Sequence, residues 1–244
     1  MKQALITGGQ QGIGFGIARA LHGAGFQIAM AAEVSPEADT VVAALQALPG
    51  ARYFQHDLAQ GDVAALLQAV GPVDCLVSNA GVPARVRGDM LDLTPDNFDF
   101  AMGINLRGTF FLAQAVARQM LATEARAYRS LIFVTSVSAQ MVSVERAEYC
   151  LSKSAAAMMA QLFAVRLAAA NIGVYDLRPG IIATPMTAGV AAKYDAAIPD
   201  LVPAGRWGQA GDVGAVAVPL ALGQMQFATG AVLPVDGGLS IQRL

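Results

Sequence analysis

The stretch TGGQQGIG, from Thr7 to Gly14, follows a short apolar run and leads into a helix-like segment. Glycines in such a strand-to-helix turn let the backbone turn tightly and approach a pyrophosphate. The free N–H groups and the dipole of the following helix stabilise that anion. The spacing is G-x-x-x-G-x-G and differs from the common G-x-G-x-x-G fingerprint. Its position after the first strand nevertheless predicts a dinucleotide site.

The rest of the chain alternates short β-like runs with longer helical segments. Strands are expected at Ala4–Thr7, Ile28–Ala32, Arg52–Gln55, Cys75–Asn79, Leu131–Ser136, Val174–Arg178 and Ala231–Val235. Helices are expected at Ile13–Gly23, Ala38–Leu48, Val63–Ala69, Phe98–Ala122, Glu148–Ala170 and after Asp212. This alternation predicts an α/β fold, with a doubly wound parallel sheet of seven strands in one domain over residues 1–244.

The segment Ala183–Gly208 fits neither pattern. It contains Pro185, Pro199 and Pro203 and shows no strand periodicity. A loop of this length inside a compact domain is usually functional. We therefore expect an insertion that lies over the substrate and is poorly ordered without ligand.

Composition and charge exclude several classes of protein. Of the 244 residues, 55% are hydrophobic and only 14% are charged, which excludes intrinsic disorder. The formal net charge of −2 and the lack of a basic block give no footprint for nucleic acid. The mean hydropathy is +0.48, but the most apolar stretch, 213–235, is interrupted by prolines and polar residues. We expect a soluble protein without a membrane partner.

Cysteine and histidine are scarce. Cys75 and Cys150 form no C-x-x-C pair, and with only His22 and His56 beside them no metal-ligand cluster is expected. The N-terminal apolar run is too short for a signal peptide. These features favour a cytoplasmic location without a bound metal.

One acidic residue lies where a dinucleotide-binding fold usually contacts the adenosine ribose. Glu33 follows Gly14 by 19 residues and comes after the second strand. Neither Gln10 nor Gln11 is basic, and no Arg or Lys follows that strand before Arg52. A 2′-phosphate would meet a carboxylate and no cation, which favours NAD and leaves NADP open. The alternative for Glu33 is a solvated loop carboxylate.

Two further residues suggest acid–base chemistry. Tyr149 and Lys153 stand four apart on a predicted helix, so phenol and ammonium share one face. A free phenol releases its proton near pH 10, and a neighbouring ammonium favours the phenolate, which suits a proton shuttle. The alternative is an ordinary exposed helix pair.

Ser136 is the third candidate. We expect it to end the fifth strand, where the carboxyl ends of parallel strands form the ligand crevice. No acid–histidine pair accompanies it, so polarisation of a carbonyl is a better role than nucleophilic attack. Capping of a local turn is the alternative.

Together these motifs resemble the short-chain dehydrogenases/reductases over essentially the whole chain. The matching residues are Thr7–Gly14, Asn79-Ala80-Gly81, Asn105, Ser136, Tyr149, Lys153, Pro179–Thr184 and Asp236-Gly237-Gly238. Arg206-Trp207-Gly208 and Asp212-Val213-Gly214 are typical of the 3-oxoacyl-[acyl-carrier-protein] reductase branch and its many relatives.

The resemblance implies a role for each matching residue. Tyr149 would exchange the proton, Ser136 would orient the substrate oxygen, Lys153 would bind the nicotinamide ribose, and Asn105 would hold a water of the proton relay. For Asn105, the alternative is a buried amide bonded to backbone. The cofactor-binding set would comprise Gly8, Gln11, Gly12, Ile13, Gly14, Glu33, Asp57, Leu58, Asn79, Ala80, Gly81, Tyr149, Lys153, Pro179, Gly180, Ile182 and Thr184. His56, Cys75 and Cys150 have no part in this scheme.

The resemblance also implies a homotetramer and an oxidoreductase of a ketone and a secondary alcohol. The substrate would be a 3-oxoacyl thioester, or alternatively a sugar or small alcohol. A non-catalytic dinucleotide-binding regulator is a less favoured alternative, because it would not need all four catalytic residues. The substrate wall is expected at Val82–Asp89, Ala139–Glu145 and Pro185–Arg206. In place of the aspartate that ends the second strand in NAD-preferring members, the chain has Ala32 followed by Glu33.

Overall fold

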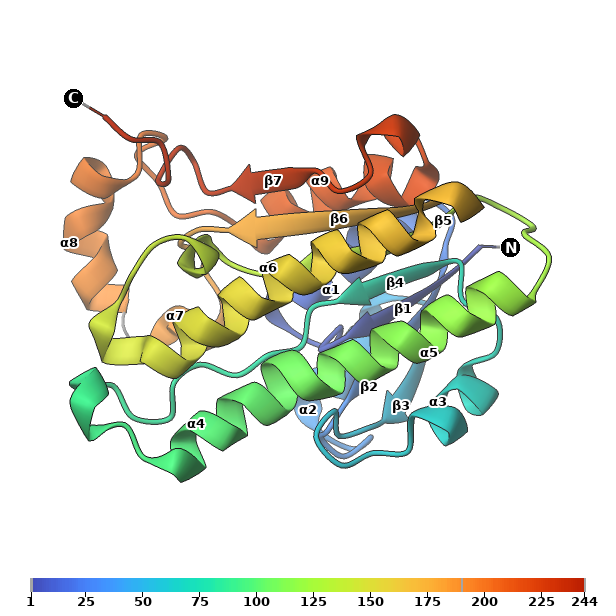
Figure 1. Cartoon of the computed structure of the whole chain (residues 1–244), viewed down its shortest axis with the longest axis horizontal. Helices are drawn as coiled ribbons and strands as arrows, with labels where there is room; N and C mark the ends of the chain where they lie inside the picture. Colours follow the sequence, from blue (N-terminus) through green and yellow to red (C-terminus); the bar gives the residue numbers. More distant parts are fainter. Residues whose placement is uncertain (1, 190, 244) are drawn as a thin grey trace.

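Seven parallel strands form the centre of the molecule. The computed structural model describes residues 2–189 and 191–243. The strands join one sheet in the order β3-β2-β1-β4-β5-β6-β7, which confirms the predicted doubly wound fold (Figure 1). Their bounds are β1 Gln3–Thr7, β2 Gln27–Ala32, β3 Arg52–Gln55, β4 Cys75–Ser78, β5 Arg129–Val134, β6 Ile172–Pro179 and β7 Val232–Val235.

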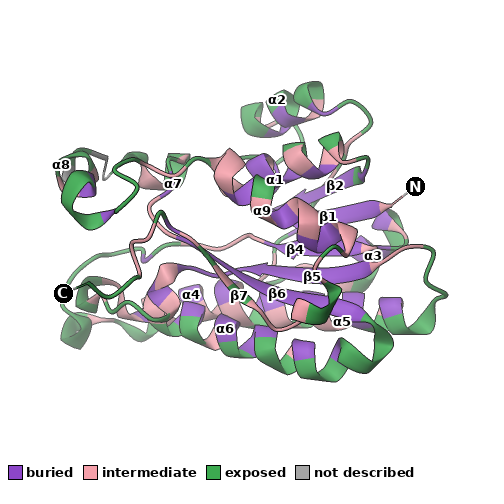
Figure 2. Ribbon diagram, turned by 90° about the horizontal axis from the view of Figure 1, so that it is seen from above, coloured by how far each residue is buried: buried purple, intermediate pink, exposed green. Residues whose placement is uncertain are grey.

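Helices cover both faces of this sheet, as Figure 2 shows in edge view. One face carries α1 (Gly12–Gly23), α2 (Asp39–Ala47) and α9 (Ala210–Leu222), and the other carries α3 (Val63–Val70), α4 (Pro95–Met102), α5 (Thr109–Ala122) and α6 (Ala147–Leu167). A separate apolar cluster lies on each face. Every residue of β1, β4, β5 and β6 is buried, so these strands do not alternate between buried and exposed positions, and in β6 the buried residues include Asp176 and Arg178.

The expected end of the fifth strand was wrong. β5 ends at Val134, and Ser136 lies two residues beyond it. The Ser136 side chain accepts a hydrogen bond from the Ser138 backbone N–H and so begins a short 3₁₀ turn, Val137–Ala139. A serine that bonds to its own local backbone competes with strand pairing, which the apolar pattern alone does not reveal.

The expectation of a loop over residues 183–208 was also wrong. The segment contains two helices, α7 (Pro185–Ala188) and α8 (Ala191–Leu201), and Gly208 forms a bridge with Ile182. Pro185 stands in the first turn of α7, where a missing N–H costs nothing, and Pro199 lies near the end of α8. The prolines therefore start and end helices here instead of preventing them.

Candidate active site

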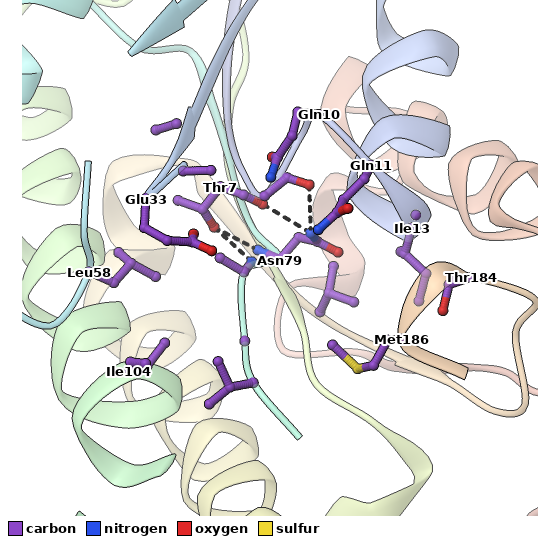
Figure 3. Close-up of a pocket in the computed structure, with 18 of the residues that line it drawn as sticks. Thr7, Gln10, Gln11, Ile13, Glu33, Leu58, Asn79, Ile104, Thr184 and Met186 are labelled. Atoms are coloured by element: carbon purple, nitrogen blue, oxygen red, sulfur yellow. Dashed lines mark hydrogen bonds between the residues drawn. The ribbon is translucent and has the colours of Figure 1, made fainter. Parts of the chain in front are cut away.

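A cavity of about 370 Å³ lies at the carboxyl ends of the central strands. In Figure 3, Glu33, Leu58 and Ile104 line one side of it, while Ile13, Thr184 and Met186 line the opposite side. Tyr149 and Lys153 line the same cavity. The predicted dinucleotide turn and the predicted acid–base pair thus share one space.

The glycine turn offers unpaired backbone donors to this cavity. Gly8 and Gly12 have φ values of +65° and +54°, which only glycine adopts without strain. Gln11 is the N-cap of α1, yet its side chain caps no backbone N–H, and the first turn of α1 has no acidic residue. The start of α1 therefore suits a pyrophosphate, since its N–H groups and dipole are free to stabilise an anion.

Hydrogen bonds fix the two strand ends that border the turn. The Thr7 hydroxyl accepts from the backbone N–H groups of Asn79 and Ala80, each at 3.0 Å. The Asn79 amide in turn donates to the Thr7 carbonyl at 3.0 Å. These contacts, dashed in Figure 3, hold Asn79-Ala80-Gly81 against the glycine turn.

Gly14 lies beneath the turn, outside the cavity lining. A Cβ atom on Gly14 would lie 2.2 Å from the Gly8 carbonyl oxygen and 2.6 Å from the Asn79 amide nitrogen. Since atoms cannot approach that closely, only glycine lets α1 pack against the end of β1. Gly14 therefore shapes the turn through its close packing and is not itself a lining residue.

The backbone around Glu33 is fixed from the neighbouring strand. The Tyr53 hydroxyl lies 2.9 Å from the Ala32 carbonyl and 2.6 Å from the Val34 carbonyl, and the Gln55 amide donates to the Glu33 carbonyl at 3.0 Å. Burial, with a smaller contribution from the Glu33 charge, raises the pKa of Tyr53 to about 12, so its hydroxyl stays a donor. Figure 3 shows the Glu33 carboxylate pointing into the cavity.

Gln10 and His56 are polar lining residues that the predicted site set did not include. Both are at least nine-tenths buried, and neither Gln10 Oε1 nor His56 Nε2 has a partner among the described residues. Burial lowers the pKa of His56 despite the opposing charges of Asp57 and Asp62, which favours the neutral ring. His56 was expected to have no part in the site, but the structure places it in the cavity lining. The unpaired Nε2 of His56 in the folded chain is what identifies this residue as part of the site.

The acid–base pair sits on α6 as the spacing predicted. Lys153 Nζ lies 5.7 Å from the centroid of the Tyr149 ring. The ammonium is buried and donates to the Val134 carbonyl at 3.2 Å, which leaves two of its three donors for other partners. The arrangement can therefore bind hydroxyl groups with Lys153 while the phenol faces the same cavity.

Asn105 lies in a π-helical turn, Gly103–Gly108, that interrupts the predicted helix Phe98–Ala122. Its amide donates to the Val82 carbonyl and to the Ser152 hydroxyl, each at 3.0 Å, and its Oδ1 accepts from the Val82 N–H at 2.7 Å. Asn105 is therefore a buried amide bonded to backbone, which was the alternative to its role in the proton relay. One lone pair of the Asn105 Oδ1 remains, on the side of Gly81. A Cβ atom added to Gly81 would lie 3.1 Å from this Oδ1 and 3.4 Å from Lys153 Nζ.

The remaining predicted residues divide into two groups. Asp57, Leu58 and Thr184 line the cavity. Ser136 is buried at 8% exposure and caps its local turn, but it is not a lining residue. Pro179, Gly180 and Ile182 also lie outside the lining; Gly180 packs on Asp236, and Ile182 belongs to the apolar cluster beneath α9.

The described residues form neither a membrane span nor a metal site. None of their helices has the length and apolarity to cross a membrane. No group of three or more His, Cys, Asp and Glu side chains among them could hold a metal ion.

Known proteins share both the sequence and the fold. A family model described as enoyl-(acyl carrier protein) reductase matches residues 8–240. The 2-dehydro-3-deoxy-D-gluconate 5-dehydrogenase of Bacillus subtilis (strain 168) is 35% identical over 97% of this chain and 94% of its own length.

Two solved structures are also similar. The 3-oxoacyl-[acyl-carrier protein] reductase of Brucella melitensis, crystallised with NAD, is 50% identical, with a TM-score of 0.93 over 100% of this chain and 98% of its own. A putative 2-deoxy-D-gluconate 3-dehydrogenase of Agrobacterium tumefaciens with bound NADP is 30% identical, with a TM-score of 0.88 over 99% of this chain and 97% of its own. With the family model covering nearly all of its length, the chain belongs to the short-chain dehydrogenase/reductase family of oxidoreductases.

Proposed function

We propose that this protein interconverts a ketone and a secondary alcohol with NAD as its cofactor. The observation that supports this most is a single cavity lined by the glycine turn, by Glu33 and by the Tyr149–Lys153 pair. The family is one of NAD(P)-dependent oxidoreductases, and the bound nicotinamide supplies or accepts the hydride.

In this proposal the protein's own residues bind the cofactor, orient the substrate and move a proton. The Tyr149 phenol donates a proton to the carbonyl oxygen during reduction and takes it back during oxidation. Lys153 binds ribose hydroxyls with its two free donors and biases the phenol. Ser136 orients the substrate oxygen, and Asn105 holds a water through its remaining lone pair. The start of α1 binds the pyrophosphate.

The chemistry of the adenosine end favours NAD over NADP. Glu33 points a carboxylate into the cavity, and the Gln10 amide lines the same region. Among the described lining residues the only Lys or Arg is Lys153, beside Tyr149. Carboxylate and amide oxygens accept hydrogen bonds from ribose hydroxyls, whereas a 2′-phosphate would meet like charge. The Brucella melitensis relative, 50% identical, has NAD bound, while the Agrobacterium tumefaciens relative, 30% identical, has NADP bound; the higher identity favours NAD.

Initial rates with both cofactors test this preference. We expect kcat/KM to favour NADH over NADPH by about tenfold to a hundredfold, because one misplaced and exposed charge costs roughly 1.4–2.8 kcal/mol. Glu33→Arg should move the ratio towards NADPH, since the guanidinium would bind the phosphate. Glu124→Arg makes the same charge change at an exposed residue outside the cavity and should leave the ratio unaltered. An unmutated protein that prefers NADPH would refute the assignment.

Two substrate classes follow from the relatives. The Brucella melitensis protein is a reductase of 3-oxoacyl thioesters by name, and the Bacillus subtilis and Agrobacterium tumefaciens proteins act on sugar acids by name. We carry both classes over to this chain. The experiment that tests the function is the consumption of NADH with members of each class.

An apolar stripe on α6 supports self-association into the tetramer that the family resemblance implies. Leu151, Met158, Leu162 and Val165 share one face of the helix, and each is more than half exposed. Figure 2 shows α5 and α6 side by side on the outer surface of the molecule, with exposed residues along both. A contiguous exposed apolar surface usually marks an interface.

Light scattering on a sizing column tests the assembly. We expect four chains of 25.2 kDa in the particle, and the double variant Leu162→Glu/Val165→Glu should yield smaller species, because buried unpaired carboxylates oppose association. Val42→Glu, which places the same charge at an exposed apolar position on α2, is the matched control. A monomeric wild-type protein, or a double variant of unchanged mass, would contradict this interface.

A further inference from the structure

Arg146 is a cation beside the reacting phenol to which neither the sequence analysis nor the relatives assign a role. It is the N-cap residue of α6 and directly follows Glu145, where the expected substrate wall stopped. Its Cζ lies 5.4 Å from the centroid of the Tyr149 ring, which is closer than the Lys153 ammonium. Its side chain is half-buried, and the Ser143 hydroxyl accepts from its Nε at 3.3 Å. The guanidinium is thus held beside the Tyr149 ring, next to the residues that line the cavity, although Arg146 is not itself one of them.

The charge of Arg146 has no carboxylate partner in the part of the chain that the structure describes. Among the described arginines, salt bridges join Arg178 to Asp176 and Arg206 to Asp212, each at 2.8 Å. In the same described part, only the Nε of Arg146 forms a hydrogen bond, so the two terminal nitrogens remain available. A planar guanidinium with both of these nitrogens free matches the two oxygens of a carboxylate.

A second guanidinium reinforces the positive potential at this rim. Arg85 lies with its Cζ 3.4 Å from the centroid of the Phe100 ring, and Phe100 lines the cavity. The loop that carries Arg85 is joined to the segment before Arg146, because the Gly88 N–H donates to the Glu145 carbonyl at 3.3 Å. The two joined segments thus carry two arginines beside lining residues, Arg85 at Phe100 and Arg146 at Tyr149.

We propose that Arg146 binds a carboxylate of the substrate while Tyr149 exchanges a proton with its carbonyl oxygen. The substrate is then a short oxo acid or the corresponding hydroxy acid. This inference rests on the proposed function and chooses between its two substrate classes. The guanidinium is adjacent to the ring that carries the reacting hydroxyl, so the carboxylate and the carbonyl must be only a few bonds apart.

The thioester class does not meet this geometry. A 3-oxoacyl thioester is uncharged around its reacting carbonyl. Its nearest anion is the phosphate at the far end of the long pantetheine arm, so that phosphate cannot contact Arg146 while the carbonyl contacts Tyr149. A thioester substrate would therefore offer Arg146 no anion to bind near the reacting carbonyl.

The test compares acids with neutral compounds of similar size. Initial rates with NADH are measured for 5-oxohexanoate against its methyl ester, for 5-dehydro-D-gluconate against the neutral D-fructose, and for acetoacetyl-N-acetylcysteamine. Three proteins are used: the wild type, Arg146→Gln, and Arg166→Gln. Arg166 is an exposed arginine near the other end of α6, so its variant makes the same change far from the cavity.

The wild type should favour the acid of a pair by about tenfold to a hundredfold in kcat/KM, the range that hydrogen bonds to a charged group contribute. Arg146→Gln should remove most of this ratio, chiefly through KM for the acid, and Arg166→Gln should retain it. A ratio that Arg146→Gln leaves unchanged, or a wild type that prefers the thioester, overturns the inference while the proposed function stands. Failure to turn over any of the five ketones would instead count against the proposed function.

Discussion

Replacing Tyr149 by phenylalanine is expected to reduce kcat by at least about 10²- to 10⁴-fold, the usual contribution of general acid–base catalysis. The variant lacks only the hydroxyl that we propose exchanges the proton, and the ring can still fill its place in the cavity lining. Binding of NADH, measured by calorimetry, should therefore stay close to that of the wild type. The separation of turnover from cofactor binding is the result that identifies an acid–base residue.

Two further variants make this result specific. Lys153→Ala should weaken both binding and turnover, because one ammonium serves the ribose and the phenol. Tyr128→Phe removes a phenol hydroxyl that bonds to Tyr175 outside the cavity, and it should retain the wild-type kcat. If Tyr149→Phe kept most of its activity, the assignment of Tyr149 would fail.

Substitution of Gly14 by alanine should weaken cofactor binding more than a methyl group added anywhere else in α1. The added Cβ would lie 2.2 Å from the Gly8 carbonyl oxygen, and a backbone atom cannot move aside as a flexible side chain can. Either α1 shifts away from β1 or the glycine turn changes its shape. Overpacking of this kind costs about 1–3 kcal/mol or more of unfolding free energy. The turn that receives the pyrophosphate is also distorted, so NADH affinity should fall at least about tenfold.

Gly23 provides a matched control on the same helix. It is the last residue of α1, and a Cβ there would meet no atom within 4 Å. Gly23→Ala should leave NADH binding intact and raise the unfolding free energy slightly, by up to about 1 kcal/mol, because alanine loses less entropy in a helix. Thermal unfolding measures the stability of both variants, and calorimetry measures their NADH affinity. Equal NADH affinity and equal thermal stability of the two variants would show that the close packing of Gly14 affects neither property.

Residues with strong local patterns were predicted well. The short apolar runs within β1 and β4 and the Tyr149–Lys153 spacing follow from rules of period and burial that act over a few residues. For the same reason the parallel sheet and the cavity at its carboxyl edge could be predicted.

The positions that could not be predicted depend on contacts between distant segments. His56 lines the cavity because β3 lies beside β2, and no local pattern distinguishes it from an ordinary core histidine. Arg146 is an exception, because it lies only three residues before Tyr149 in the sequence; as an isolated arginine it looks like any surface charge. The proline-containing segment around α8 was misjudged because proline prevents a helix only in certain positions.

The π-turn at Gly103–Gly108 also has a consequence for how this sequence aligns with others. A turn that closes from residue i to i+5 holds one residue more than an ordinary helical turn, so it amounts to an insertion that the helix has absorbed. One extra residue rotates everything after it by about 100° relative to what precedes it. A helical wheel drawn through 95–122 therefore changes phase in this turn. Gapless alignment with a chain that lacks the turn would pair Asn105 with a residue on the wrong face.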